Sequence, residues 1–372
     1  MKKKLLIAAL VSLAFVACSK DNTTSINEGG GIRFSASVTN PTRANQTQLS
    51  NLNSFNVTAV GDSQIYFTDL AVNSADNGVT WTTAQTYYWP SYQLAFYAFA
   101  PTSVEGVNFG FSGQSIDDFT PAVNVADQKD LVLAYAEGTK EANETSGVPL
   151  VFKHALSQVN IQAKCSNPNL KIEVLGVKVS HIPSAATFTF PAMTGATDDW
   201  VAQNLWVPGA DFTEYMIKGE SAVTLTAEAQ SIMFGDDRFM LIPQQLIAWT
   251  ESTANDGSYL SVLCRISSVN GDVTTVLYPD ATDKYAFSAI PIDTNWMPGY
   301  RYTYTLEYGS NSGSGGGQID PQPTNPLDPT DPDVDVTPKP GSEAGDQILS
   351  NPIKFTVTVD EWQDADGGEI QM

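Results

Sequence analysis

Histidine, cysteine and basic residues are scarce in this chain of 372 residues, and each scarcity narrows the range of functions. Two histidines leave little room for histidine-based catalysis or histidine-rich metal sites. The 19 lysines and arginines are outnumbered by 41 aspartates and glutamates, which gives a formal net charge of −22. Because so acidic a chain repels phosphate backbones, we do not expect it to bind nucleic acid. We expect no cofactor either.

Long apolar runs and long helical patterns are also missing. Beyond the first twenty residues no stretch has the length of a transmembrane helix, and we find no convincing long amphipathic helix. The 27 glycines, the 21 prolines and the many threonines, serines, valines and tyrosines favour strands and turns. With 42% hydrophobic residues the chain can bury a real core. We therefore predict an all-β fold.

Apolar and polar residues alternate with the period of a strand along most of the chain. In the clearest run, 300–308, one face would carry Tyr300, Tyr302, Tyr304, Leu306 and Tyr308. Residues 159–163 alternate in the same way. Gly176 separates two short apolar runs and predicts a β-bulge.

Changes in composition divide the chain into six segments. The polar run 137–147 is the best domain boundary, because no strand pattern crosses it. The Gly/Ser and Pro/Asp composition from residue 309 onward cannot bury a core, so we expect an extended and partly stiff linker there. The predicted segments are a signal peptide (1–17), a lipidated tether (18–31), two β-sandwich domains (32–145 and 146–308), this linker (309–349) and a C-terminal donor-type strand segment (350–372).

The first twenty residues are typical of a secretory signal. Three lysines at positions 2–4 precede a short apolar stretch from Leu5 to Ala17, which is too short to span a bilayer comfortably. The small residues just before Cys18 resemble the bacterial lipobox, whose cysteine is acylated and becomes the new N-terminus. Several acyl chains on Cys18 would hold the protein in a membrane. The alternative is an ordinary signal peptide with an incidental cysteine.

Two heptapeptides near the ends of the chain share one pattern. Residues 32–38 and 353–359 both read isoleucine, base, phenylalanine, hydroxyl, small apolar, hydroxyl, valine. In a strand, alternate residues point to the same face, so a groove shaped for one heptapeptide could accept the other in the same register. The inward residues would be Ile32, Phe34, Ala36 and Val38 in the first strand and Ile353, Phe355, Val357 and Val359 in the last.

A polar loop between the first strand and the body offers a site for proteolysis. Residues 40–47 contain a proline and a single arginine, followed by Ala44. A cut after Arg43 would remove the lipid anchor and the first strand together. The open sheet edge could then be filled by the C-terminal strand of another subunit. The alternative is chance similarity, since all-β proteins reuse isoleucine, phenylalanine, threonine and valine.

These features together resemble the fimbrillin-type proteins, subunits of the type V pili of Bacteroidetes. The resemblance implies two tandem transthyretin-like, Greek-key β-sandwich domains behind a lipoprotein signal peptide. It also implies lipidation at Cys18, export to the outer membrane surface, trimming after Arg43 by a trypsin-like protease, and polymerisation with other fimbrial subunits by strand exchange to support adhesion. The long Pro/Asp segment departs from a compact stalk subunit, so stalk, tip and anchor roles stay open. The motifs are Cys18, Arg43-Ala44, Tyr87-Tyr-Trp-Pro90 and the runs 152–159, 241–245 and 296–304.

The remaining histidine, aspartate and cysteine residues favour structural interpretations, and we predict no catalytic or metal site. His154 sits among apolar neighbours, as a structural histidine would. The aspartates between 328 and 335 offer oxygens of the kind that calcium binds, but they lack the pattern of an EF-hand loop and are better read as a solvated linker. Cys165 and Cys264 could pair in an exported protein or stay unpaired in apolar strands.

Two other functions are alternatives to the fimbrial one. A surface glycan-binding lipoprotein that does not polymerise would keep Cys18 and place exposed aromatics such as Trp81 or Trp206 on a platform. Its C-terminal strand would be an ordinary intramolecular one. A secreted hydrolase is the weakest alternative, because the sequence has no recognisable nucleophile–base or acid–base set.

Overall fold

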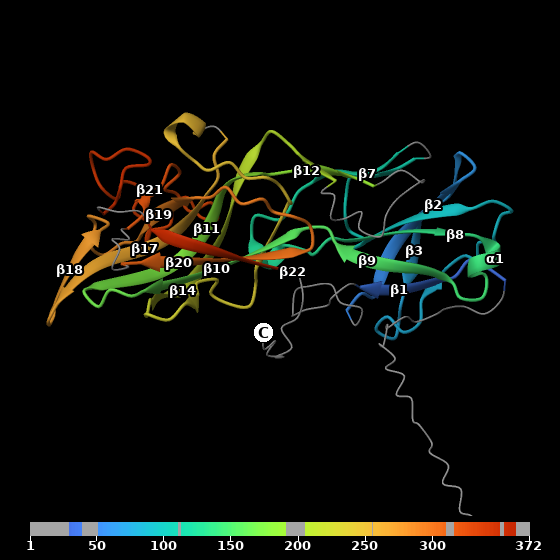
Figure 1. Cartoon of the computed structure of the whole chain (residues 1–372), viewed down its shortest axis with the longest axis horizontal. Helices are drawn as coiled ribbons and strands as arrows, with labels where there is room; N and C mark the ends of the chain where they lie inside the picture. The colour runs from blue at the N-terminus through green and yellow to red at the C-terminus, as the bar shows by residue number, and fades with distance from the viewer. Residues whose placement is uncertain are drawn as a thin grey trace, which may run out of the picture.

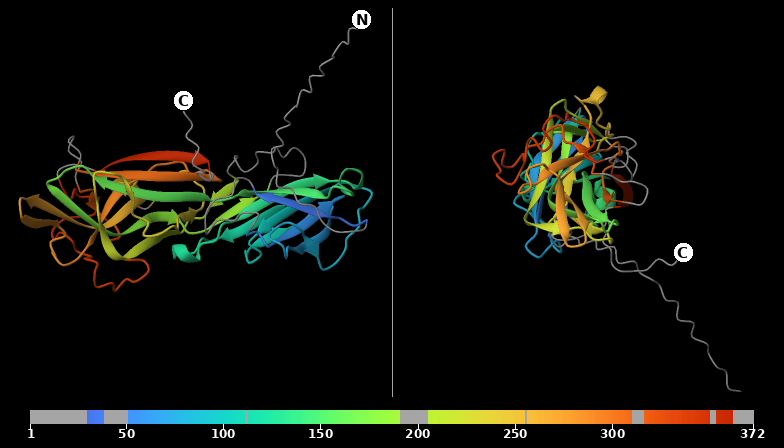
Figure 2. Two further views of the ribbon diagram at one scale, coloured as in Figure 1. Left: turned by 90° about the horizontal axis from the view of Figure 1, so that it is seen from below. Right: turned by 90° about the vertical axis from the view of Figure 1, so that its left-hand side faces the viewer.

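The computed structural model describes residues 30–38, 51–110, 113–190, 205–254, 256–309, 316–349 and 353–361. Cys18, Arg43 and Ala44 lie outside these residues. The described part is built almost entirely of strands, and two β-sandwiches lie end to end along the long axis (Figures 1 and 2). Within the described part, no helix combines the length and the apolar character needed to cross a membrane.

The first sandwich is built around a seven-stranded sheet. Phe152 of its second strand and Phe55 of its fifth have ring centroids only 5.0 Å apart. Neighbouring strands lie about 4.8 Å apart, so a flat sheet would hold these rings much farther from each other. The sheet is therefore rolled, and its first two strands face the others. Its order is β1 (Phe34–Val38), β9 (Val148–His154), β8 (Val132–Gly138), β5 (Leu94–Ala100), β2 (Ser54–Gly61), β3 (Gln64–Asn73) and β4 (Thr82–Thr83).

A smaller sheet covers the other face of β5 and β8. Tyr97 and Leu133 share a buried cluster with Phe109 and Phe188 of this smaller sheet. Because β5 is covered on both faces, all seven of its residues are buried, which explains its continuous apolar sequence. The order of the small sheet is β13 (Trp206–Pro208), β12 (Ala186–Thr189), β7 (Gln114–Phe119) and β6 (Val107–Phe109).

The sheets do not divide at the predicted boundary between residues 145 and 146. β9, β12 and β13 all follow residue 146, yet they belong to the sheets of the first sandwich. The polar run that suggested the boundary connects the antiparallel neighbours β8 and β9, and it contains the short helix α1 (Lys140–Asn143). A surface connection between paired strands is as polar as a linker, and for that reason composition did not distinguish them.

The second sandwich packs two sheets face to face. One contains β15 (Gln230–Ser231), β10 (Ser157–Cys165), β20 (Tyr300–Tyr308) and β22 (Lys354–Glu361), with β16 (Phe239–Leu241) also paired to β10. The other contains β14 (Phe212–Thr224), β11 (Leu170–Pro183), β17 (Tyr259–Asn270), β19 (Ala286–Pro291) and β21 (Gln318–Ile319), with β18 (Val273–Tyr278) paired to β17. Two 3-10 turns, η1 (Val125–Asp127) and η3 (Glu251–Thr253), complete the described elements.

The alternation in the sequence correctly predicted the inward faces of this sandwich. In β20, Tyr302, Tyr304, Leu306 and Tyr308 are buried, while the intervening residues are partly exposed. Val159, Ile161 and Ala163 of β10 enter the same core. The pairing register of β11 shifts between Val174 and Gly176, which confirms the predicted bulge.

Residues 316–349 do not form the extended, solvated linker that their composition predicts. They fold back onto the second sandwich, where β21 joins the sheet beside β19. Three apolar side chains, Ile319, Val334 and Ile348, are buried in this region. The aspartates neutralise lysines of the sandwich, an effect that residue composition alone does not reveal.

Candidate strand-exchange site

The first strand fills a deep groove in the first sandwich. Ile32, Phe34 and Ala36 are buried at 6%, 2% and 0% exposure, and Val38 packs partly buried against the same cluster. The Phe34 ring meets Phe55 and Phe96 edge to face, at centroid distances of 6.3 and 5.7 Å. The four residues predicted to point inward therefore lie on one face in the core.

Backbone hydrogen bonds hold β1 along β9 and fix the residues just before it. β1 runs parallel to β9 with Phe34 opposite Val148 and Val38 opposite Phe152. Just before β1, the Val148 N–H donates to the Arg33 carbonyl at 2.8 Å, and the Ile32 N–H donates to the Tyr87 carbonyl at 2.7 Å. The segment around Tyr87, one of the motifs identified in the sequence, thus supports the entry of β1 into the groove.

β1 makes up half of one layer of the sandwich. β9 pairs with β8 at only two positions, Val132–His154 and Leu133–Lys153, so β9 turns away from the rest of the sheet and carries β1 with it. These two strands pack on the aromatic cluster around Phe55 and Phe96, together with Trp81 and Trp89. Loss of β1 would expose that cluster and leave β9 with an open edge, which is a template for another strand.

The C-terminal strand lies at the edge of the second sandwich. β22 pairs antiparallel with β20, and Phe355, Val357 and Val359 stand opposite Leu306, Tyr304 and Tyr302 (Figure 1). The Phe355 ring lies 6.1 Å from that of Tyr304. Ile353 is buried at 5% exposure, Phe355 and Val357 are half-buried, and Val359 is 49% exposed. This strand therefore covers its own domain only partly.

The structure does not bring the two heptapeptides together. β1 is in the first sandwich and β22 is in the second, each at a sheet edge. The pairing of β22 with β20 was not predicted for the fimbrial function. β10 pairs with one edge of the run 300–308, and the other edge was therefore open to a further strand.

Both histidine side chains make contacts that join parts of the fold. His154 Nδ1 lies 2.8 Å from Asp130 Oδ2, and both side chains are at most 2% exposed. A pair so deeply buried joins β9 to the start of β8 and is closed to a substrate. His181 contacts the Gly257 carbonyl through Nδ1 at 2.8 Å.

The two described cysteines and the aspartates between 328 and 335 also lie in surroundings that favour a structural role. Cys165 and Cys264 are both free and buried. Burial raises the pKa of the Cys264 thiol to about 12, against the opposing effect of a hydrogen bond with Tyr308, so this thiol is protonated and unreactive at neutral pH. Asp331 and Asp333 bind Lys218, and within the described ranges no group of acidic, histidine or cysteine side chains is arranged to hold a metal ion.

The aromatic residues proposed for a glycan platform are buried. Trp81 has no exposed surface, and its ring centroid is 4.9 Å from that of Phe55. Trp206 is 5% exposed and donates its indole N–H to the Ala155 carbonyl at 2.7 Å. A platform built from these two residues is therefore wrong.

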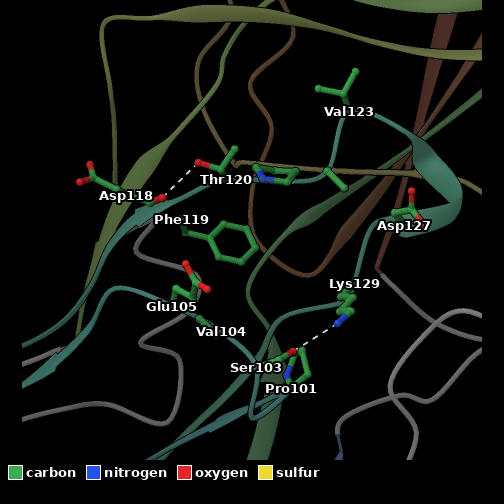
Figure 3. A pocket seen from close by; sticks show the side chains of 12 residues that line it. Pro101, Ser103, Val104, Glu105, Asp118, Phe119, Thr120, Val123, Asp127 and Lys129 are labelled. Atoms are coloured by element: carbon green, nitrogen blue, oxygen red, sulfur yellow. Dashed lines mark hydrogen bonds between the residues drawn. The ribbon is translucent and has the colours of Figure 1, made fainter. Parts of the chain in front are cut away.

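A cleft of about 490 Å³ opens beside β7 and η1 (Figure 3). Phe119 and Val104 form part of its wall, and Glu105, Asp118 and Asp127 stand around it. Lys129 points to Ser103, with Nζ 3.2 Å from Oγ. The described residues that line it include neither histidine nor cysteine.

Comparison with known proteins identifies a family whose model matches this chain. A family model described as fimbrillin-like matches residues 42–321. Among solved structures, the chain resembles a fimbrial protein from Bacteroides vulgatus ATCC 8482, with 13% identity, a TM-score of 0.52 and coverage of 92% of this chain and 99% of that one. It also resembles proteins named "putative cell adhesion protein" from Parabacteroides distasonis ATCC 8503 (10% identity, TM-score 0.49, 92% and 99% covered) and Bacteroides uniformis ATCC 8492 (14%, 0.44, 92% and 100%). No curated protein matches the chain.

Proposed function

Because the chain belongs to the fimbrillin-like family, we propose that it is a structural subunit of a bacterial surface fimbria that assembles by strand exchange. In this proposal β1 is a temporary plug, and its place is taken by residues 353–359 of another subunit. The assembled fibre would support adhesion at the cell surface. The family is one of structural subunits, and the proposal includes no catalytic step.

The observation that carries the proposal is the construction of the first sandwich. β1 supplies half of a two-stranded layer, and its inward residues are almost completely buried. Burial of an isoleucine or phenylalanine side chain is worth about 1.5–3 kcal/mol. An empty groove would therefore be unfavourable by several kcal/mol, and this free energy becomes available to a strand that fills it.

The C-terminal heptapeptide matches the groove position by position. Ile353 and Phe355 would take the places of Ile32 and Phe34, and Val359 that of Val38. Among the inward-facing positions, the one difference is Val357 in place of Ala36. Two added methyl groups gain about 0.8 kcal/mol each when buried without strain, whereas overpacking costs about 1–3 kcal/mol. The substitution is therefore close to neutral, and the register is kept.

The resting position of β22 favours its release. Phe355 and Val357 are only half-buried beside β20, and Val359 is half-exposed. The corresponding residues of β1 are much more deeply buried. A strand that moves from the β20 edge into an emptied groove buries more apolar surface than it uncovers, and this difference drives exchange in one direction.

Export and processing complete the proposal and rest on the sequence alone. Lipidation at Cys18 would hold the precursor in the outer membrane, and a trypsin-like protease would cut between Arg43 and Ala44. Such a cut leaves β1 attached to the anchor but separated from the body. β1 is then held only by non-covalent contacts and can be displaced.

Controlled proteolysis of the purified precursor tests this function. Trypsin should cut first after Arg43, as read by mass spectrometry, and SDS-resistant oligomers should follow. Val357→Lys should abolish the oligomers, because Val357 faces the groove. Thr358→Lys is the matched control, since Thr358 lies next to it on the exposed face, and it should leave assembly unchanged. Cut protein that stays monomeric, or equal effects of the two lysines, would overturn the proposal.

A further inference from the structure

Residues 316–349, which we name the clasp, are fastened to the outer face of the second sandwich. Their prolines and aspartates predict a free tether, but the contacts described below fix them to β11, β14, β17 and β19. The clasp ends at Leu349, only four residues before Ile353. Its attachment therefore decides where the C-terminal strand starts.

A fully buried lysine forms the first attachment. The Lys178 side chain in the middle of β11 has no exposed surface, and its Nζ lies 3.4 Å from Asp320 Oδ2 and 3.0 Å from Glu214 Oε1. It also donates hydrogen bonds to the main-chain carbonyls of Gln322 and Thr324. A buried ammonium group must be paired and hydrogen-bonded. Two of its carbonyl acceptors and one of its two carboxylates come from the clasp.

A second lysine holds the middle of the clasp. Lys218 Nζ on β14 lies 2.6 Å from Asp331 Oδ2 and 3.0 Å from Asp333 Oδ2. Asn325 donates from Nδ2 to the same oxygen of Asp331 at 2.8 Å. The Asp331 side chain is only 5% exposed, so this carboxylate depends on the partners that the sandwich and the clasp provide.

Apolar contacts also attach the clasp to the second sandwich. Val334 is buried among Leu175, Met216, Leu263 and Phe287, all of which belong to the sheet face that points away from the main core. Ile348, near the end of the clasp, enters the main core itself. The segment therefore acts as a partial third layer of the second sandwich.

We propose that the clasp fixes the base of the C-terminal strand at Leu349, so that neighbouring subunits of the fibre are joined by a short connection. This inference rests on the proposed function. A free segment from residue 309 to 352 would span about 150 Å when extended, whereas the step from Leu349 to Ile353 spans about 14 Å. The partner is the first sandwich of a second copy, which must lie directly against the second sandwich of the donor.

Insertions test this joint without disturbing the core. Eight Gly/Ser residues placed after Leu349 would lengthen a four-residue joint about threefold, but a free tether only about 1.2-fold. We expect the axial repeat of fibres in electron micrographs to become longer and irregular. The same insertion at Gly271, an exposed turn between β17 and β18, is the matched control and should leave the repeat unchanged. A wild-type repeat with the insertion after Leu349 would overturn the inference.

Lysine variants test the attachment itself in the monomer. Hydrogen exchange on precursor carrying Arg43→Gln, which cannot be trimmed, should show protected amides in the clasp. Lys218→Met should raise their exchange rate at least tenfold, while Lys171→Met, on a partly exposed ion pair of β11, should not. Fast exchange in the unsubstituted clasp would overturn the inference. Fibres with the same axial repeat for the insertion after Leu349 and for the Gly271 control would also overturn it while leaving the proposed function intact, whereas trimmed wild-type protein that forms no fibres would overturn the proposed function.

Discussion

β1 and β22 are two edge strands with nearly the same sequence pattern and very different surroundings. β1 closes the aromatic core of the first sandwich, and its Phe34 is 2% exposed. β22 lies on the rim of the second sandwich, where Phe355 is half-buried and Val359 is 49% exposed. The pattern of a strand thus sets which face is apolar, but the depth of the groove sets how tightly the strand is held. In the proposed exchange, the deeply held strand therefore needs a covalent cut before it leaves, whereas the shallow strand moves without one.

The largest expected effect concerns the deeper strand. Phe34→Ala should destabilise the first sandwich by about 3–5 kcal/mol, because a buried ring is lost and a cavity is left. Phe355→Ala should cost much less, since that ring is partly solvated on the rim. Urea unfolding of the two variants measures the difference. Equal losses of stability in the two variants would contradict the conclusion that β1 is held more tightly than β22.

The clasp, from which β22 starts, should be held to the second sandwich more firmly than β22 itself. Lys178→Met should cost about 3–5 kcal/mol, since it leaves Asp320 buried and without its cation. Combining it with Asp320→Leu should restore most of the loss, because a buried pair replaced by apolar residues is often neutral or stabilising. Thermal unfolding tests both. A single variant as stable as wild type would contradict the role of Lys178.

Acid should loosen one end of the clasp selectively. Burial opposes ionisation of Asp331, but hydrogen bonds from Lys218 and Asn325 outweigh it and hold the pKa of that carboxyl below its ordinary value. Its contribution to stability is therefore present above about pH 3.9 and is lost as the pH falls through the lower folded-state pKa.

Glu214, at the other attachment, behaves in the opposite way. Burial raises its pKa despite Lys178, so its stabilising contribution is present at low pH and is lost as the pH rises through the folded-state value. Hydrogen exchange, corrected for the intrinsic pH effect, should show acid loosening near Asp331 before the segment near Asp320. Simultaneous loosening at both ends would argue against this assignment.

The smallest effect is expected for Val357→Ala, which makes the donor heptapeptide more like β1. The gain from two buried methyl groups and the strain of placing them at the Ala36 position nearly cancel. Exchange affinity should therefore change by less than about tenfold, which is 1.4 kcal/mol. Competition between wild-type and variant peptides for trimmed subunits measures it. A complete loss of binding would show that Val357 does not occupy that position.

The sequence predicted the strands well where a single face is buried. The alternation in β10 and β20, the bulge at Gly176 and the inward face of β1 all follow from local pattern. The connectivity between sheets could not be predicted in this way, because β9 and β12 look alike whichever sandwich they join.

The clasp is the clearest limit of sequence reasoning here. Prolines and aspartates are typical of a solvated linker, and only the position of Lys178 inside β11 shows why the segment is drawn onto the sandwich. A lysine in the middle of an apolar strand is a usable signal, because it requires an anionic partner. The position of β22 beside β20 depends on an edge that only the assembled sheet reveals.

Binding of a synthetic peptide of residues 350–372 to the subunit is the most direct test of strand exchange. The subunit should lack its own residues 350–372, so that β22 does not compete, and it should be compared before and after the cut at Arg43. We predict binding to the trimmed subunit alone, with loss on Phe355→Lys in the peptide and none on Thr358→Lys, because the matching residue of β1, Ser37, is partly exposed. Equal binding to both forms of the subunit, or no binding to either, would contradict it.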